Sequence, residues 1–233
     1  MNRSEHHHKL VIGAIIFPRM DQFDLTGPFE VLSRLPHSTF HILGKEKLPI
    51  RDARGLILTP EVAFSEAPPL DVLVVPGGPG QVDLMEDEVT LSFIRQQAAD
   101  AKLVFSVCTG TLTVAAAGLL KGIRGTTHWA SFAVLEHLGV IPVNQRVMID
   151  GKFVSAAGVS SGIDGALRVA ALLRGERVAQ EIQLYMQYAP EPPFNSGTPA
   201  TAPAEVLAAA RKASAEATEA RMAAAKRVAV KFL

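Results

Sequence analysis

The single cysteine of the sequence, Cys108, lies at a junction that suits a catalytic nucleophile. It follows an apolar run typical of a buried strand, Lys102–Val107, and precedes a predicted helix from Thr109 to Leu120. Free N–H groups and the positive dipole end at a helix amino terminus favour a thiolate. Gly110 is expected to leave room for a substrate above the sulfur. We therefore interpret Cys108 as a nucleophile, although a free cysteine is more often a small core residue.

Two carboxylates are candidates for the acid or base that such a thiol needs. Asp24 comes shortly after the first apolar run, Lys9–Phe17, and Glu30 follows in a helix predicted over Thr26–Leu35. Thr26 is expected to cap that helix, which would leave Asp24 free to reach a nucleophile on a neighbouring strand. A turn or capping role for Asp24 is the alternative.

A glycine-rich turn, Pro76–Gly80, follows another apolar run, Asp71–Val75. The amides of Gly77 and Gly78 could join that of Thr109 as donors to a developing negative charge. The turn lacks the glycine spacing and the lysine of the common phosphate-binding loops, so a phosphate site is disfavoured.

His128 and Trp129 come directly after Gly125-Thr126-Thr127, where a short strand is predicted to end at residues 126–128. A histidine close to a cysteine suggests a Cys–His pair. The alternative is that His128 lines the pocket or holds a loop. A helix is predicted over Trp129–Leu138.

Alternating apolar and amphipathic runs must position these residues. They predict an α/β fold: a single domain with a mostly parallel sheet flanked by helices, as in flavodoxin-like proteins, and a C-terminal helical arm. In such sheets the carboxyl ends of the strands share one edge, where ligand sites form. The other predicted strands are Thr39–Leu43, a short strand at Gly55–Pro60, and a hairpin of Arg146–Ile149 with Lys152–Ala156; the other helices are Glu88–Ala99, Ser160–Leu173 and Glu176–Tyr188.

Composition excludes several functional classes. The 233 residues contain 23 Lys and Arg against 23 Asp and Glu, so the chain lacks the electrostatic footprint of a nucleic-acid or anionic-membrane binder. One cysteine cannot form an internal disulfide or a thiolate zinc cluster, which favours a cytoplasmic protein. The apolar run Leu10–Phe17 is too short for a membrane-spanning helix of about 20 residues.

We expect four parts along the chain. Residues 1–8, with His6–His8, are predicted to be a flexible leader, and residues 9–188 the α/β domain. Residues 189–203 contain five prolines and should run as an extended segment. Residues 204–233 are alanine-rich and predict one long helix that packs on the domain or on a second subunit.

Taken in order, the motifs resemble those of the DJ/PfpI superfamily, which is related to the class I glutamine amidotransferase domain. The similarity extends from about Leu10 to the C-terminal helix and is strongest to the bacterial branch that hydrates isocyanides. The motifs are Asp24–Pro28 (DLTGP), Val75–Gly78 (VPGG), Ser106–Gly110 (SVCTG), Thr126–Trp129 (TTHW) and Tyr188–Asn195 (YAPEPPFN).

The resemblance implies a homodimeric lyase without metal or organic cofactor that converts isocyanides to N-substituted formamides. It implies that Cys108 attacks the isocyanide carbon to form a thioimidate while Asp24 serves first as acid and then as base, which makes Glu30 the second choice. Thr109 stands where the protease branch has a histidine, so proteolysis is disfavoured. Gly77, Gly78, Thr109, His128 and Trp129 are the candidates for positioning the substrate.

Two other functions stay open. A glyoxalase or redox stress protein of the same superfamily would use the same cysteine, although no second cysteine is present to resolve a disulfide. The ligand-binding domain of a transcription regulator is disfavoured, because only the alanine-rich arm follows residue 203 and the net charge is zero.

Overall fold

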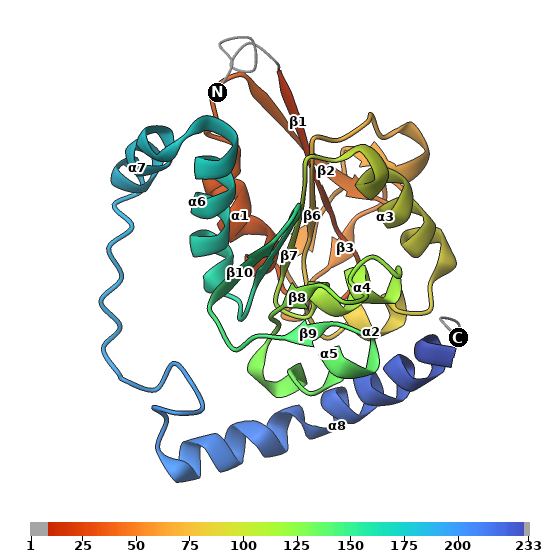
Figure 1. The fold of residues 1–233 in the computed structure, drawn as a ribbon, viewed down its shortest axis with the longest axis vertical. Coiled ribbons are helices and arrows are strands. Elements are labelled where there is room, and N and C mark those ends of the chain that lie inside the picture. Colours follow the sequence, from red (N-terminus) through yellow and green to blue (C-terminus); the bar gives the residue numbers. More distant parts are fainter. Residues whose placement is uncertain (1–8, 231–233) are drawn as a thin grey trace.

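A seven-stranded sheet forms the centre of the computed structural model, which describes residues 9–230 (Figure 1). The predicted leader with His6–His8 and the last three residues lie outside the described part of the chain. All neighbouring strands are parallel except one antiparallel hairpin, in which Val147–Asp150 pairs with Phe153–Ala156. This is the hairpin predicted from the Asp150-Gly151 turn. The strand order is β10 (Val147–Asp150), β11 (Phe153–Ala156), β7 (Leu103–Val107), β6 (Val72–Val75), β1 (Leu10–Ile15), β2 (Ser38–Gly44) and β5 (Val62–Ala63).

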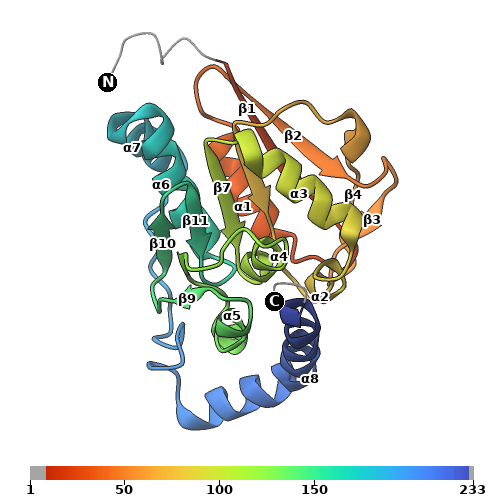
Figure 2. The same ribbon diagram turned by 45° about the vertical axis from the view of Figure 1, so that its right-hand side comes forward.

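Helices cover both faces of this sheet, as predicted for a parallel α/β fold (Figures 1 and 2). On one face α1 packs against α6, and α6 packs against α7. On the other face α2, α3 and α4 pack together beside β6 and β7. The bounds are α1 Phe23–Leu32, α2 Gln81–Leu84, α3 Glu88–Asp100, α4 Gly110–Ala116, α6 Ser161–Arg174 and α7 Glu176–Tyr185.

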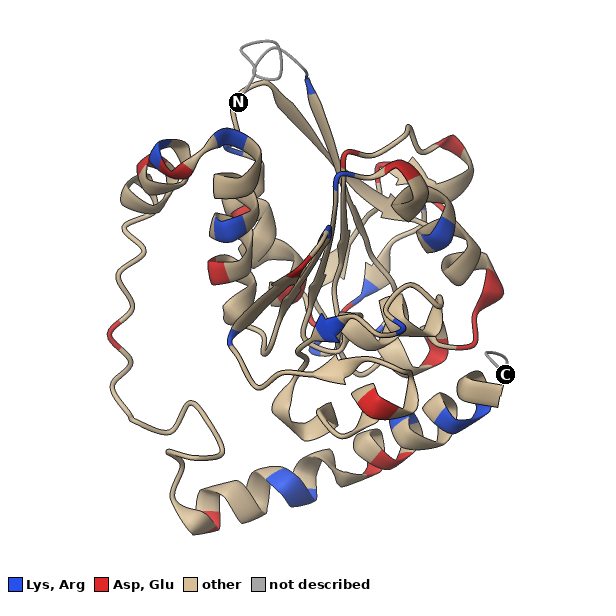
Figure 3. Ribbon diagram, viewed as in Figure 1, with Lys and Arg blue, Asp and Glu red and all other residues tan. Residues whose placement is uncertain are grey.

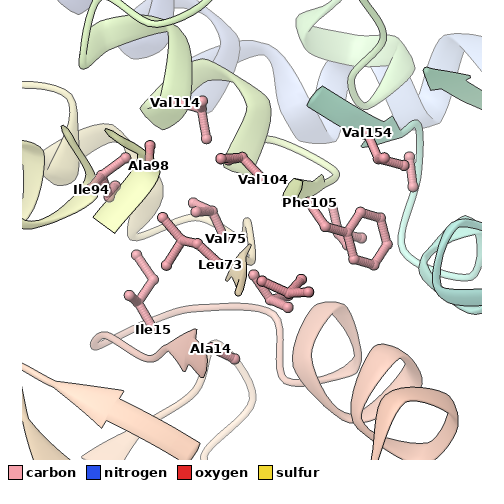
Figure 4. Close-up of a cluster of buried hydrophobic side chains, with 14 of the residues drawn as sticks. Ala14, Ile15, Leu73, Val75, Ile94, Ala98, Val104, Phe105, Val114 and Val154 are labelled. Atoms are coloured by element: carbon pink, nitrogen blue, oxygen red, sulfur yellow. The ribbon is translucent and has the colours of Figure 1, made fainter. Parts of the chain in front are cut away.

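The core lies between the sheet and these helices, and β6 and β7 are buried on both faces (Figure 4). Their side chains alternate between the two faces, as the strand geometry requires. Phe105 points to the α6 side, where a Cβ at Gly165 would come within 2.7 Å of its ring. Ile94 and Ala98 of α3 lie on the side of Val104 (Figure 4). This packing holds β7, and therefore Cys108, rigidly in place.

Several predicted elements differ from the structure in their bounds. The predicted strand at Gly55–Pro60 is a two-residue strand, β4 (Ile57–Leu58), paired with β3 (Ile50–Arg51) outside the main sheet. The predicted helix over Trp129–Leu138 is split into a 3₁₀-helix, η3 (Trp129–Ser131), and α5 (Val134–His137). The remaining short elements are the 3₁₀-helix η2 (Phe64–Glu66) and the paired strands β8 (Arg124–Gly125) and β9 (Ile141–Pro142).

Helix α1 begins three residues before the predicted start. It runs from Phe23, so Asp24 lies in its first turn and Thr26 does not cap it. The Asp21 carboxylate accepts the N–H of Phe23 and thereby replaces the predicted cap, while the Thr26 hydroxyl donates to Gln22 Oε1. Propensity rules predict a threonine hydroxyl at this position to bond a backbone N–H, but the Thr26 hydroxyl bonds the side chain of Gln22 instead.

The C-terminal helix α8 (Ala204–Ala229) crosses the end of the domain near α2 and α5 (Figures 1 and 2). Its second half buries one face, formed by Arg221, Ala224, Ala225 and Val228, against η3 and helices α2, α4 and α5. Acidic and basic residues are interspersed along the elements (Figure 3). In the described part of the chain, no helix combines the length and the apolar character that crossing a membrane requires.

Candidate active site

Cys108 forms a sharp turn between β7 and α4. Its φ of +56° lies in the left-handed region, which costs a non-glycine residue roughly 1–3 kcal/mol and persists only where the surroundings enforce it. Two hydrogen bonds hold the residue: its N–H donates to Ala156 O at 2.9 Å, and its carbonyl accepts the Thr127 hydroxyl at 2.7 Å. The side chain is buried beneath the carboxyl edge of the sheet. The predicted strand–turn–helix nucleophile geometry is thus present, with added backbone strain.

Gly110 serves a different purpose from the one predicted. A Cβ at this position would lie 2.0 Å from the Val75 carbonyl oxygen and 2.8 Å from that of Pro76. The space beside Gly110 is therefore filled by the end of β6, not left open for a substrate. Glycine here lets the first turn of α4 press against the neighbouring strand, which brings the glycine-rich turn next to the cysteine.

Asp24 is fully buried and faces the same turn. Its Oδ2 accepts the N–H of Gly77 at 2.9 Å, so the carboxylate binds a neighbouring loop and does not cap its own helix. Its Oδ1 is the one buried side-chain oxygen or nitrogen without a standard hydrogen bond in the described residues. Burial, and then the Asp21 carboxylate, raise the pKa of Asp24 to about 7, against smaller lowering effects of the Gly77 amide and the Cys108 thiol.

For the Cys108 thiol, burial opposes the ionised form that the helix terminus was predicted to favour. Burial raises its pKa well above the ordinary value, and the Asp24 carboxylate raises it further. The amide of Thr109 and the charge of Arg221 lower the pKa by less. The amide at the helix terminus lowers the pKa of Cys108, as predicted, but the increase caused by burial is larger. Because the Asp24 carboxylate raises the pKa of Cys108, the thiol ionises more readily when Asp24 is protonated.

The amides of Gly77 and Gly78 have partners inside the protein. The Gly77 amide donates to Asp24, and the Gly78 amide donates to the Thr109 hydroxyl at 3.0 Å. A Cβ at Gly77 would lie 2.6 Å from the Thr109 nitrogen, and Gly78 has a φ of +126°. These glycines are required so that the turn can approach α4, and they orient the acid and the residue after the nucleophile.

His128 and Trp129 follow Thr127, which binds the Cys108 carbonyl. Within the described residues, no hydrogen bond joins His128 to Cys108. The His128 Nδ1 instead accepts the N–H of Ala130 at 3.3 Å and caps the amino terminus of η3. Burial and the positive charge of Arg221 lower the pKa of His128, which favours the neutral ring. The two rings lie 5.4 Å apart, centre to centre. His128 therefore holds a loop, the alternative that the sequence left open.

Glu30, the second candidate for the acid, is not buried in the site as Asp24 is. It is exposed on the outer side of α1 and forms an ion pair with Arg34. Asp24 is therefore the carboxylate on this helix that lies next to the thiol. In the described residues, no group of three or more His, Cys, Asp or Glu side chains is arranged to hold a metal ion.

The sequence reasoning missed Arg221 of α8, which is 7% exposed and reaches the back of the site. Its guanidinium donates to Gly78 O at 3.1 Å, to Gln81 Oε1 at 3.3 Å and to Ser131 Oγ at 3.3 Å. A signal was present, because Arg221, Ala224, Ala225 and Val228 follow the i, i+3, i+4, i+7 spacing of one helix face. An arginine on an otherwise small, apolar face marks a buried cation.

Comparison with known proteins agrees with this geometry. The pattern of the DJ-1/PfpI family matches residues 11–172. The isonitrile hydratase of Pseudomonas putida is 49% identical over 96% of this chain and 98% of that protein. The deglycase PfpI of Pyrococcus furiosus is 28% identical over 61% of this chain and 88% of that protein.

The solved structure of a ThiJ/PfpI family protein from Pseudomonas syringae superposes with a TM-score of 0.91 at 36% identity, over 97% of this chain and 96% of that one. The predicted fold and superfamily are therefore confirmed. The chain belongs to the DJ-1/PfpI family.

Proposed function

We propose that the chain is an isocyanide hydratase, a lyase that converts isocyanides and water to N-substituted formamides. One observation carries the proposal: a buried carboxyl, Asp24, lies beside the single thiol, has a pKa of about 7 and keeps one oxygen unpartnered in the described structure. Such a group can both give and accept a proton near neutral pH. The 49% identity to an isonitrile hydratase over nearly the whole chain supports the same reaction.

The first step uses the one proton that Cys108 and Asp24 share. When Asp24 holds this proton, the Cys108 thiolate attacks the terminal carbon of the isocyanide and forms a C–S bond. That carbon must also gain a proton, and Asp24 delivers it. The product is a neutral thioimidate, R–N=CH–S–Cys108, and Asp24 is left ionised. Covalent capture splits a difficult hydration into two easier steps.

The second step uses the carboxylate as a base. Asp24 takes a proton from water as the water oxygen attacks the thioimidate carbon, and it passes this proton to the nitrogen, which leaves Asp24 ionised again. The tetrahedral adduct then loses Cys108 and forms the C=O bond of the formamide, and the hydroxyl proton returns to the Cys108–Asp24 pair. The unpartnered Oδ1 is the atom we assign to this water, because Oδ2 is held by the Gly77 amide.

The surrounding residues orient these groups. We assign to Gly77 the orientation of Asp24, and to Gly78 the orientation of Thr109. Thr109, His128 and Trp129 are proposed to border the substrate. Thr109 directly follows Cys108, and the segment with His128 and Trp129 is held near Cys108 because the Thr127 hydroxyl donates to the Cys108 carbonyl. No step of this scheme uses a metal or an organic cofactor. The small, uncharged substrate also suits a buried site.

The proposal has a direct test with a commercially accessible substrate. Purified protein and cyclohexyl isocyanide should yield N-cyclohexylformamide, detected by mass spectrometry. Cys108→Ala should abolish turnover and Asp24→Asn should reduce it at least a hundredfold, within the ~10²–10⁴ range of general acid–base catalysis. Glu30→Gln is the matched control on the same helix and should retain activity. An active Cys108→Ala protein, or turnover of methylglyoxal without turnover of isocyanide, would refute the assignment.

We further propose that the enzyme is a cytoplasmic homodimer that binds no nucleic acid. The single cysteine and the balanced charge support this setting. Large apolar side chains are exposed at Leu184 and Tyr185 of α7 and at Phe194 of the proline-rich segment, and a second subunit could cover them. Light scattering of the full chain, together with a DNA-binding assay at two salt concentrations, tests both statements.

A further inference from the structure

Arg221 is a buried cation without a carboxylate partner in the described structure. It is 7% exposed, and its three hydrogen bonds go to a backbone carbonyl, an amide oxygen and a hydroxyl. No carboxylate lies within ion-pair distance of it among residues 9–230. The other arginine near the C-terminal end of α8, Arg227, pairs with Glu86 at the surface. Burying an arginine without an opposite charge is costly, so a compensating charge is expected close by.

The compensating charge is the one carried by the Cys108–Asp24 pair. The Arg221 guanidinium donates to the Gly78 carbonyl, and the Gly78 amide donates to the Thr109 hydroxyl. The amide of Gly77, the preceding residue, donates to Asp24. The Gly77–Gly78 turn therefore links Arg221 to Asp24 and to Thr109, the residue that follows Cys108. Burial lowers the pKa of Arg221, and Cys108 raises it by less, so an ionised Cys108 sulfur would interact favourably with the guanidinium.

Among the described residues, three charged side chains act on the pKa of the Cys108 thiol, and His128 interacts with two of them, Arg221 and Asp21. Asp24 from α1 and Asp21 from the preceding turn contribute negative charge, and both raise the pKa of the thiol. Burial and Arg221 lower the pKa of His128, which caps η3, and thereby favour its neutral form. Arg221 from α8 is thus the positive side chain that acts on the thiol in the described structure, and it lowers the thiol pKa.

We infer that Arg221 is a positioning residue that stabilises the Cys108 thiolate, so that the C-terminal helix is a working part of the active site. With one proton shared between sulfur and carboxyl, a cation on the sulfur side favours the form in which Asp24 is protonated and Cys108 is ionised. That is the form that can attack a carbon and protonate it. The effect on isocyanide turnover rests on the proposed function, whereas the effect on the thiol does not.

The test measures the thiol itself. Because Cys108 is the single cysteine, its alkylation by iodoacetamide can be followed by intact mass spectrometry from pH 6 to 10. Arg221→Gln keeps a donor for the Gly78 carbonyl but removes the charge, and Arg221→Lys keeps the charge. Arg211→Met, on the exposed half of the same helix, is the matched control.

Arg221→Gln should slow alkylation at pH 8 about tenfold and move its pH midpoint up by about one pKa unit, because one unit is a tenfold change in thiolate. Arg221→Lys should recover most of the rate, and Arg211→Met should match the unmodified protein. Circular dichroism checks that each variant folds; if Arg221→Gln does not, Arg221→Met is used for the same measurement. The inference would be overturned if the pH midpoint of alkylation stayed unchanged in a folded Arg221→Gln or Arg221→Met protein. It would also be overturned if Arg221→Lys slowed alkylation as much as the uncharged variant does.

The two proposals fail separately. If Arg221→Gln shifts the pH profile of alkylation and the unmodified protein does not hydrate isocyanides, then the role of Arg221 in stabilising the thiolate is supported and the proposed function is refuted. If isocyanides are hydrated and the alkylation profile does not move, then the role of Arg221 falls alone.

Discussion

Replacing Asp24 by Asn should make the protein more stable and nearly inactive at the same time. The carboxyl is fully buried, and its Oδ1 has no hydrogen bond of standard geometry in the described structure, although the Cys108 thiol lies close enough to lower the pKa of the carboxyl. Asn has nearly the shape of the protonated acid and can still accept the Gly77 amide. The substitution therefore removes a buried negative charge while keeping the packing. Catalytic residues that carry such unfavourable charges are a known source of trade-offs between stability and activity.

The magnitude follows from the pKa of Asp24. Folding raises it from 3.8 to about 7, a difference of roughly three pKa units, which corresponds to ~4 kcal/mol at ~1.36 kcal/mol per unit. Because the folded pKa is the higher one, the protonated form stabilises the fold below pH ~4, and this stability is lost as the pH rises to about 7. The side-chain amide of the Asp24→Asn variant does not titrate. The gain from Asp24→Asn should therefore be about 1 kcal/mol at pH 4.5 and approach ~4 kcal/mol at pH 8.

Urea unfolding at fixed protein concentration, followed by the fluorescence of the single tryptophan, Trp129, measures this difference at both pH values. Glu30→Gln is the control, because Glu30 is an exposed carboxylate on the same helix, and a surface substitution changes stability by no more than about 0.5 kcal/mol. A gain that does not grow between pH 4.5 and pH 8, or a loss of stability at pH 8, would show that the buried carboxylate is not the source of the cost.

Three further outcomes are expected. Gly110→Ala should lower the free energy of unfolding by ~3 kcal/mol or more, measured by urea titration, because the new Cβ would lie 2.0 Å from the Val75 carbonyl oxygen; an ordinary stability would contradict the close approach. The kcat/KM for isocyanide should fall about tenfold per pH unit below pH ~7, where Asp24 and the thiol both hold protons, as initial rates from pH 5 to 9 would show; a flat profile would contradict it. Thr109→Val leaves the Gly78 amide without its acceptor, which should cost ~1–3 kcal/mol of stability by thermal unfolding and reduce kcat; no change in either would refute that role.

The fold was predictable because its signals are local. Continuous apolar runs such as Asp71–Val75 and Lys102–Val107 indicate strands buried on both faces, and that is how β6 and β7 lie. The alternation of such runs with amphipathic segments is sufficient to predict a parallel sheet. Bounds of helices were less predictable where a side chain from outside the segment took the capping role, as Asp21 does at α1.

Part of the candidate site was predictable for a topological reason. Cys108, Asp24 and the Pro76–Gly80 turn all follow strands, and the carboxyl ends of parallel strands share one edge. Their meeting therefore follows from the sheet alone. The chemistry of their contact does not, because a pKa depends on burial and on neighbours that are distant in sequence. The sequence pattern indicated the effect of the helix terminus on the Cys108 thiol, but not the opposing effects of burial and of Asp24 on its pKa.

Residue types and short spacings were enough to establish the α/β fold, the nucleophile at a strand–helix junction and a nearby acid. Which groups touch one another depended on the folded chain. The structure shows that Gly77 holds Asp24, that Gly110 accommodates a strand and not a substrate, and that Arg221 reaches the site from α8. Hydrogen bonds and Coulomb forces act over a few ångströms, so residues far apart in the chain meet only once the whole fold has formed.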